Sequence, residues 1–161
     1  MYGYKKLKMK YYIILLLLLP LSCMEMPTNG AETFNLSGNH FAIAVKDLKK
    51  TGDFYANTLK INEIDISSTG LPHRWFKLNK GLEIHLVSSD KTLPKKTRNN
   101  HLAIQTNNIN VVASYLKGEK IEYYDWLGNS NTIQERFDGV LQIYLTDPEG
   151  NWIEINQKAK L

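Results

Sequence analysis

An internal repeat constrains the fold of this chain more than any other feature. The stretch "NHFAI" at residues 39–43 returns as "NHLAI" at residues 100–104, with histidine second in each copy. Further on, "GLEIHLV" (81–87) aligns with "GNWIEIN" (150–156) at a longer offset, which indicates an insertion within "YYDWLGNSNTIQERFDG". A repeat in a short chain indicates a duplicated structural unit. The sequence therefore predicts two modules, residues 38–90 and 99–157, joined by a linker at residues 91–98.

Both modules begin with the same order of periodic patterns. "HFAIAV" (40–45) and "HLAIQT" (101–106) alternate with the period of two that is typical of strands. A helical pattern follows each strand, with Asp47 and Asn108 as the expected N-caps. Further strands are predicted at "HRWFKL" and "LEIHLV", and at "LQIYLT" and "NWIEIN". Each module is thus expected to be a strand, a helix and then several strands, which makes the fold class α+β.

Polar side chains are expected to gather on one face of each sheet. In the last strand of each module, alternation assigns the isoleucines to the helix-packed face, and His85 or Glu154 to the opposite face. The first strands place His40 and His101 on that same opposite face. If the modules pair symmetrically, these four side chains meet in one cleft.

The N-terminal segment predicts export. Four lysines precede an apolar run from Tyr11 to Leu19, and small residues follow it, which is typical of a secretory signal over residues 1–22. The run is about half the length of a spanning helix, although an uncleaved membrane anchor is the alternative.

Cys23 is the only cysteine, so the chain cannot form an internal disulfide. "LPLSC" resembles a bacterial lipobox, which implies a lipid on Cys23, a flexible tether over residues 23–37, and anchoring to a bacterial membrane on its periplasmic or cell-surface side. The alternative is an ordinary secreted protein with an unrelated cysteine.

The charge distribution argues against nucleic acid as a partner. Four of the 20 basic residues lie in residues 1–22, so the remaining 16 equal the 16 acidic residues. Nucleic-acid affinity depends on clustered lysine and arginine. The basic residues of "KTLPKKTRNN" (91–100), Arg98 among them, are interpreted as a solvated connector.

Three stretches together resemble the vicinal oxygen chelate superfamily, which includes glyoxalase I, extradiol dioxygenases and bleomycin-binding proteins. They are "NHFAIAVKDLKKTGDFYANTL", "HLAIQT" and "YLTDPEGNWIEI". The resemblance covers residues 38–157. It implies the glyoxalase/bleomycin resistance/dihydroxybiphenyl dioxygenase fold, in which two βαβββ modules form a cup-shaped mixed sheet around a divalent metal.

Carried over by position, the resemblance implies that His40, His101 and Glu154 are metal ligands. His85 falls on a fourth position, where glyoxalase I has a glutamate. Such a set suits Zn, Ni, Co, Mn or Fe. Glu154 is also the expected catalytic base. By alternation, further residues are expected to line the substrate cleft: His73, Trp75, Glu83, Gln142 and Tyr144.

The function implied by this resemblance is a metal-dependent lyase or isomerase of the glyoxalase I type, which stabilises an enediolate formed from a small-molecule substrate. A homodimer is expected. Two alternatives remain open: a non-catalytic module that binds a small molecule, and an extradiol-type dioxygenase.

Overall fold

A computed structural model describes residues 36–157. The predicted signal segment, Cys23 and nearly all of the tether lie outside these residues, so export and lipidation stay predictions. Within residues 36–157, no helix has the length and apolar character needed to cross a bilayer.

The first module contains one helix and four strands. It begins with β1 (His40–Val45) and α1 (Leu48–Asp53), and a π-helical turn (Phe54–Thr58) extends α1 by five residues. The remaining strands are β2 (Asn62–Ile64), β3 (His73–Lys77) and β4 (Glu83–Ser88), with short 3-10 turns at Ser67–Thr69 and Asn79–Gly81. The helical pattern predicted from the sequence is therefore present, but its second half is π-helical.

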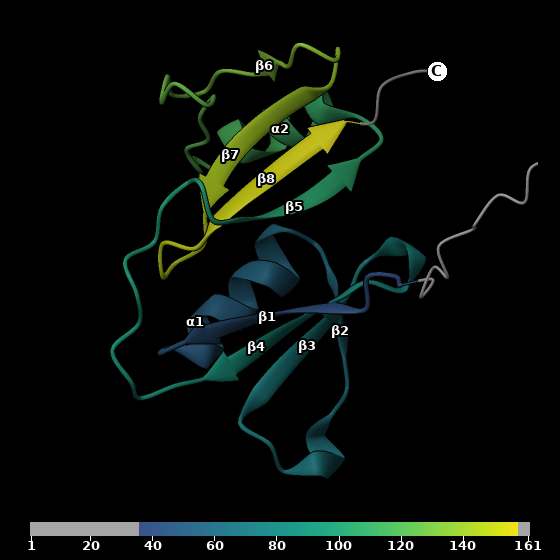
Figure 1. The fold of residues 1–161 in the computed structure, drawn as a ribbon, viewed down its shortest axis with the longest axis vertical. Helices are drawn as coiled ribbons and strands as arrows, with labels where there is room; N and C mark the ends of the chain where they lie inside the picture. The colour runs from purple at the N-terminus through teal and green to yellow at the C-terminus, as the bar shows by residue number, and fades with distance from the viewer. Residues whose placement is uncertain (1–35, 158–161) are drawn as a thin grey trace, which may run out of the picture. The chain divides into compact units, whose positions relative to one another are not determined.

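The second module repeats this order. Its elements are β5 (His101–Thr106), α2 (Ile109–Gly118), β6 (Gln134–Glu135), β7 (Leu141–Thr146) and β8 (Trp152–Gln157). Figure 1 shows β5, β8 and β7 side by side, with α2 behind them. The prediction of two βαβββ modules is confirmed. In this chain they form two separate four-stranded sheets, ordered β1-β4-β3-β2 and β5-β8-β7-β6.

The strand register is the same in both modules, and it positions the polar residues. β1 runs parallel to β4 and pairs Ala42 with His85, while β5 runs parallel to β8 and pairs Ala103 with Glu154. His40 and His101 each lie two residues before these alanines, so each shares a sheet face with its module's polar residue. On the other side, β3 places Trp75 opposite His85, and β7 places Tyr144 opposite Glu154.

The opposite face of each sheet packs against its helix. Ile84 and Leu86 are fully buried in the first module, and Ile153 and Ile155 are buried in the second, as alternation predicts. Asp47 accepts a hydrogen bond from the Lys50 amide at 2.8 Å, and Asn108 accepts from the amides of Asn110 and Val111. Both predicted N-caps are therefore confirmed, and they fix where each helix leaves its first strand.

Two turns of the second module share the pattern D-x-x-G-N, at residues 125–129 and 147–151. In each turn the aspartate Oδ1 accepts from the asparagine amide, and its Oδ2 accepts from the asparagine Nδ2 at 2.7 Å. The glycine amide donates to the aspartate carbonyl, and the glycine φ is +97° at Gly128 and +79° at Gly150. Only glycine adopts such φ values at little cost.

Candidate metal-binding site

His101 and Glu154 form a close pair on the sheet of the second module. The His101 Nε2 lies 3.2 Å from the Glu154 Oε2, and the Glu154 residue is only 5% exposed. The other ring nitrogen, Nδ1, lies 2.7 Å from the Arg98 carbonyl oxygen. A carbonyl accepts only from N–H, so Nδ1 carries a proton; when the ring is neutral, Nε2 therefore presents its lone pair toward Glu154.

The Glu154 carboxylate is held by neighbours on both oxygens. Tyr144 donates its hydroxyl to Oε2 at 2.7 Å, and the Asn156 amide donates to Oε1 at 2.7 Å. The Arg136 guanidinium lies 3.7 Å from Oε1. Burial raises the pKa of the Tyr144 hydroxyl well above its usual range, and the hydrogen bond to Glu154 raises it further. Tyr144 therefore stays protonated and serves Glu154 as a donor.

In the first module, His85 lies between two other rings. Trp75 stacks on His85 at 3.9 Å between ring centroids, and His40 stacks on its other side at 4.3 Å, with all three rings nearly parallel. The His85 Nε2 lies 2.9 Å from the Glu83 Oε2, and the His40 Nδ1 lies 2.6 Å from the Asn39 Oδ1. The lone pairs of parallel rings do not converge, so one imidazole must turn before both can bind one ion.

The structure therefore brings the four predicted ligands together as two separate pairs, His40 with His85 and His101 with Glu154. Within residues 36–157 of a single chain, no three histidine, cysteine or acidic side chains gather closely enough to hold a metal ion.

The second pair fits a metal by its chemistry and spacing. Zinc bonds to histidine nitrogen and carboxylate oxygen are about 2.1 Å long, so ligands set about 90–110° apart would lie roughly 3.0–3.4 Å from one another. The 3.2 Å between the His101 Nε2 and the Glu154 Oε2 falls in this range. If the His101 nitrogen is neutral, its lone pair also faces a lone pair of the Glu154 oxygen, and the two repel each other. A cation bound between the two atoms, or a proton, removes this repulsion.

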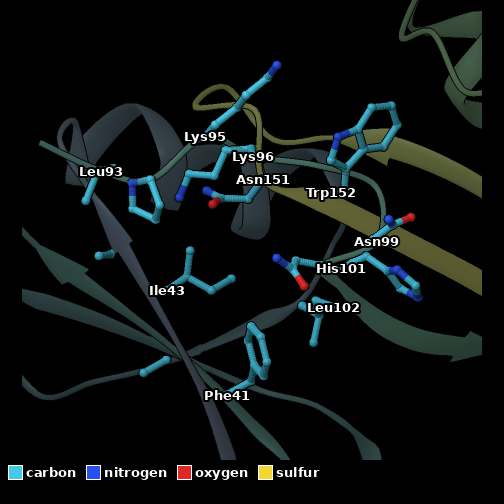
Figure 2. Close-up of a pocket in the computed structure, with 14 residues that line it drawn as sticks. Phe41, Ile43, Leu93, Lys95, Lys96, Asn99, His101, Leu102, Asn151 and Trp152 are labelled. Carbon is cyan, nitrogen blue, oxygen red and sulfur yellow. The ribbon is translucent and has the colours of Figure 1, made fainter.

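A pocket of about 560 Å³ adjoins His101 (Figure 2). Phe41 and Ile43 come to it from β1, Lys95 and Lys96 from the connector, and His101 from β5. Phe41 lies on the predicted apolar face of β1 but is 45% exposed, because it borders this pocket rather than the buried core. The volume is in the range of small-molecule sites.

The residues predicted to line the cleft have several different surroundings. Trp75 and Glu83 contact His85, and Tyr144 contacts Glu154. Gln142 is buried, and its amide donates to the Gln134 side chain at 3.1 Å. His73 borders a different surface pocket, formed by residues 63–67 and Leu71, and its partner across the sheet is Val87 rather than His85.

Sequence reasoning missed Arg98 and its place among aromatic rings, of which only Tyr144 was predicted to line the cleft. Its guanidinium carbon lies 4.3 Å from the centre of the Trp152 ring, 5.7 Å from that of Tyr144 and 6.0 Å from that of Tyr124. The interpretation of the connector as wholly solvated is therefore wrong at Arg98. The sequence did contain one signal for this contact, the D-x-x-G-N pattern at residues 125–129. This pattern predicts a tight turn, whose backbone carbonyls can accept hydrogen bonds from an arginine side chain.

The match to known families is consistent with this geometry. The model of the Glyoxalase/Bleomycin resistance protein/Dioxygenase superfamily matches residues 38–155. The chain belongs to this superfamily. Members of the superfamily commonly use divalent metal ions, typically bind small-molecule substrates and often form dimers. No curated protein matches the chain.

Solved structures of this superfamily's fold resemble the chain over most of its length. A protein from Bacillus anthracis, described as belonging to the glyoxalase family, has a TM-score of 0.64 and 21% identity, covering 79% of this chain and 98% of its own. The oxidase ChaP-H2 has a TM-score of 0.64 and 19% identity, with coverages of 78% and 95%. A lactoylglutathione lyase from Agrobacterium tumefaciens has a TM-score of 0.58 and 14% identity, with coverages of 75% and 92%. At these identities the likeness shows the fold alone.

Proposed function

We propose that this protein is a divalent-metal-dependent lyase or isomerase of the glyoxalase I type. The observation that carries the proposal is the His101–Glu154 pair: the Nε2 of His101 and the Oε2 of Glu154 lie 3.2 Å apart, while the Nδ1 of His101 is turned to the Arg98 carbonyl. His40 and His85, at the equivalent positions of the first module, would complete a set of three imidazoles and one carboxylate. Such a donor set suits Zn, Ni, Co, Mn or Fe.

The expected substrate is a small molecule with two neighbouring oxygens, such as the adduct of a 2-oxoaldehyde with a thiol. A bound metal would polarise a substrate oxygen and stabilise negative charge there. Glu154 is the proposed base that moves a proton between adjacent carbons, and Tyr144 and Asn156 fix the orientation of its carboxylate. Glu83, hydrogen-bonded to His85, is the second carboxylate available for proton transfer.

We further propose that two chains assemble as a homodimer and share each metal site. The proposal is supported by the separation of the four ligands into two pairs within one chain. It is also supported by the sheet order, in which β1 and β5 are both edge strands. Edge strands present unpaired backbone groups that favour association with another chain.

A second candidate function is a module that binds a small molecule without turnover. The stack of Trp75, His85 and His40 favours it, because the outer faces of the two end rings offer aromatic surface to a planar ligand without a metal. The two functions differ in their response to chelation. Turnover of a 2-oxoaldehyde–thiol adduct that disappears on chelation supports the lyase, whereas ligand binding that survives chelation without turnover supports the binding module.

The first test is the metal content of the protein, purified without chelators or a histidine tag and measured by elemental mass spectrometry. We expect close to one metal ion per chain in the wild type and at least a tenfold loss in His101→Ala, because the ion loses one of its imidazoles. His73→Ala is the matched control, because this histidine borders a different pocket and belongs to neither pair. Equal and negligible metal in all three proteins, even after reloading, would refute the metal-dependent function.

A further inference from the structure

Arg98 ties the linker between the modules to the sheet of the second module. Its Nη1 donates to the Asp125 carbonyl at 2.9 Å and also to the Trp126 carbonyl, both within the first D-x-x-G-N turn. Its guanidinium carbon lies within 4.3 to 6.0 Å of the centres of the Trp152, Tyr144 and Tyr124 rings. Contacts between an arginine guanidinium and aromatic rings are attractive, and more strongly so when they are shielded from water. The position of Arg98 is therefore fixed by its side chain.

The main chain of the same residue touches the metal-site histidine. The Arg98 carbonyl accepts from the His101 Nδ1 at 2.7 Å, across a turn closed by a hydrogen bond from the Asn100 amide to the Thr97 carbonyl. Residues 90–96 before this turn form no helix or strand. The direction of the Arg98 carbonyl is thus set by the turn and by the anchored side chain.

The direction of that carbonyl matters because a neutral imidazole has two forms. With the proton on Nδ1, the Nε2 lone pair faces Glu154, as a metal ligand requires; with the proton on Nε2, the ring presents N–H instead. A hydrogen bond from the outer nitrogen to a backbone carbonyl selects the first form and orients the ring.

We propose that Arg98 is the positioning residue of His101. The aromatic rings and the two turn carbonyls hold the guanidinium, the guanidinium holds the turn at 97–100, and the carbonyl of that turn keeps the His101 proton on Nδ1. The importance of this role for metal binding rests on the function proposed above. The effect of Arg98 on the proton position in His101 does not rest on that function, because it is measured without metal.

The test uses the full chain labelled with ¹⁵N, and it compares the wild type with Arg98→Ala and Lys91→Ala. Two-bond ¹⁵N–¹H spectra at alkaline pH, with no metal present, report which nitrogen of His101 carries the proton. We expect Nδ1–H in the wild type and in Lys91→Ala, the matched control, because Lys91 lies exposed in the same linker, outside the pocket at His101, and leaves the Arg98 contacts intact. In Arg98→Ala we expect a mixture of the two forms. The proton positions in His40 and His85 should not change.

A zinc titration against a competing chelator is the second readout. We expect Arg98→Ala to bind zinc about 10–100-fold more weakly than the wild type, as is usual when a group that orients a ligand is lost. If a folded Arg98→Ala keeps the His101 proton on Nδ1, the proposal is overturned. If the wild type binds no zinc but the proton still moves in Arg98→Ala, the metal function fails and the positioning role stands.

Arg98→Lys decides the matter if Arg98→Ala does not fold. Lysine keeps the charge and the alkyl stem, but it cannot lie flat against Trp152 while donating to two carbonyls. We expect its His101 to show both proton positions. An Arg98→Lys protein with His101 identical to the wild type would overturn the proposal.

Discussion

At the scale of single residues, Asp125 and Asp147 show how different surroundings change the same hydrogen-bond pattern. Each aspartate closes a D-x-x-G-N turn with matching bonds. Burial nevertheless raises the pKa of Asp147 above its usual value of 3.8. The hydrogen bond from the Asn129 side chain lowers the pKa of Asp125 below that value. The two aspartates should therefore respond to pH in opposite ways.

The raised pKa of Asp147 gives a contribution to stability that is complete below its unfolded pKa and is lost as the pH rises through the folded pKa. The lowered pKa of Asp125 gives a contribution that is present above the unfolded pKa and is lost as the pH falls through the folded pKa. Relative to Asp147→Asn, the wild type should lose stability as the pH rises from about 3.8. Relative to Asp125→Asn, it should gain stability as the pH rises toward that value.

The measurement is the free energy of unfolding in urea at a series of pH values from the acid range to neutrality. Both variants place an amide nitrogen in the same hydrogen-bond pattern, so the part of the stability loss that does not depend on pH is similar. Each variant is therefore the control for the other. Differences that change in the same direction for both variants would contradict the assignment.

At the residue scale, the sequence predicted which side chains share a sheet face but not their contacts. Alternation placed His40, His85, His101 and Glu154 on the correct faces because strand periodicity depends only on the local sequence. The stack of Trp75 on His85 depends on the strand register, and the burial of Arg98 depends on where a linker turns back. Neither is encoded in a short window of sequence.

At the scale of elements, Gly52 leaves room for a side chain of the sheet beneath α1. A Cβ at this position would overlap the guanidinium of Arg74 on β3. Arg74 is paired with Asp53 at 2.8 Å and with Glu63 at 2.6 Å, and it donates to the Lys49 carbonyl. The glycine therefore leaves room for the ion pairs that join α1, β2 and β3.

We expect Gly52→Ala to destabilise the protein by about 1–3 kcal/mol, because it displaces a guanidinium held by several partners. In an Arg74→Ala background the overlap is gone, and alanine in place of a helical glycine should stabilise by about 0.5–1 kcal/mol. Unfolding free energies of the wild type, the two single variants and the double variant measure this coupling. A Gly52→Ala effect of the same sign and size in both backgrounds would exclude the proposed overlap.

The elements were more predictable than the residue contacts. Both N-caps and most strands follow from capping and alternation, which act within a few residues. The π-helical turn at Phe54–Thr58 has no signal of this kind, and β2 and β6 were not individually located because they are short. Comparing the repeats located the insertion. That comparison could not predict the turn at 125–129 within it, because this turn depends on an aspartate–asparagine pair.

At the scale of the whole molecule, the repeat predicted the duplicated architecture, which was the most secure result of the sequence. In the proposed homodimer the ligand pairs of two chains would meet in one site, and this arrangement makes a sharp prediction. In a two-fold dimer with shared sites, a chain carrying His40→Ala and a chain carrying His101→Ala together form one complete site and one site lacking both histidines.

Mixing these two variants, each unable to hold metal alone, should restore about a quarter of the wild-type metal if chains exchange randomly. Elemental mass spectrometry of the co-expressed proteins measures this restoration. The matched control mixes His40→Ala with His85→Ala, two changes in the same module, and it should restore none. Failure to restore metal in the first mixture, when the wild type is loaded, would show that each site lies within one chain.

The parallel pairing of the first and last strands in each module also bears on how the chain folds. β1 cannot form its ladder until β4 is present, because the ladder pairs His40 with Glu83. In the same way, β5 cannot pair until β8 is present. Neither sheet needs a strand from the other module. The slow step, in which the first and last strands of a sheet find each other, therefore occurs once within each module and never across the whole chain. The first module can complete its sheet while the second is still being synthesised, and the duplication thus shortens the longest search that folding requires.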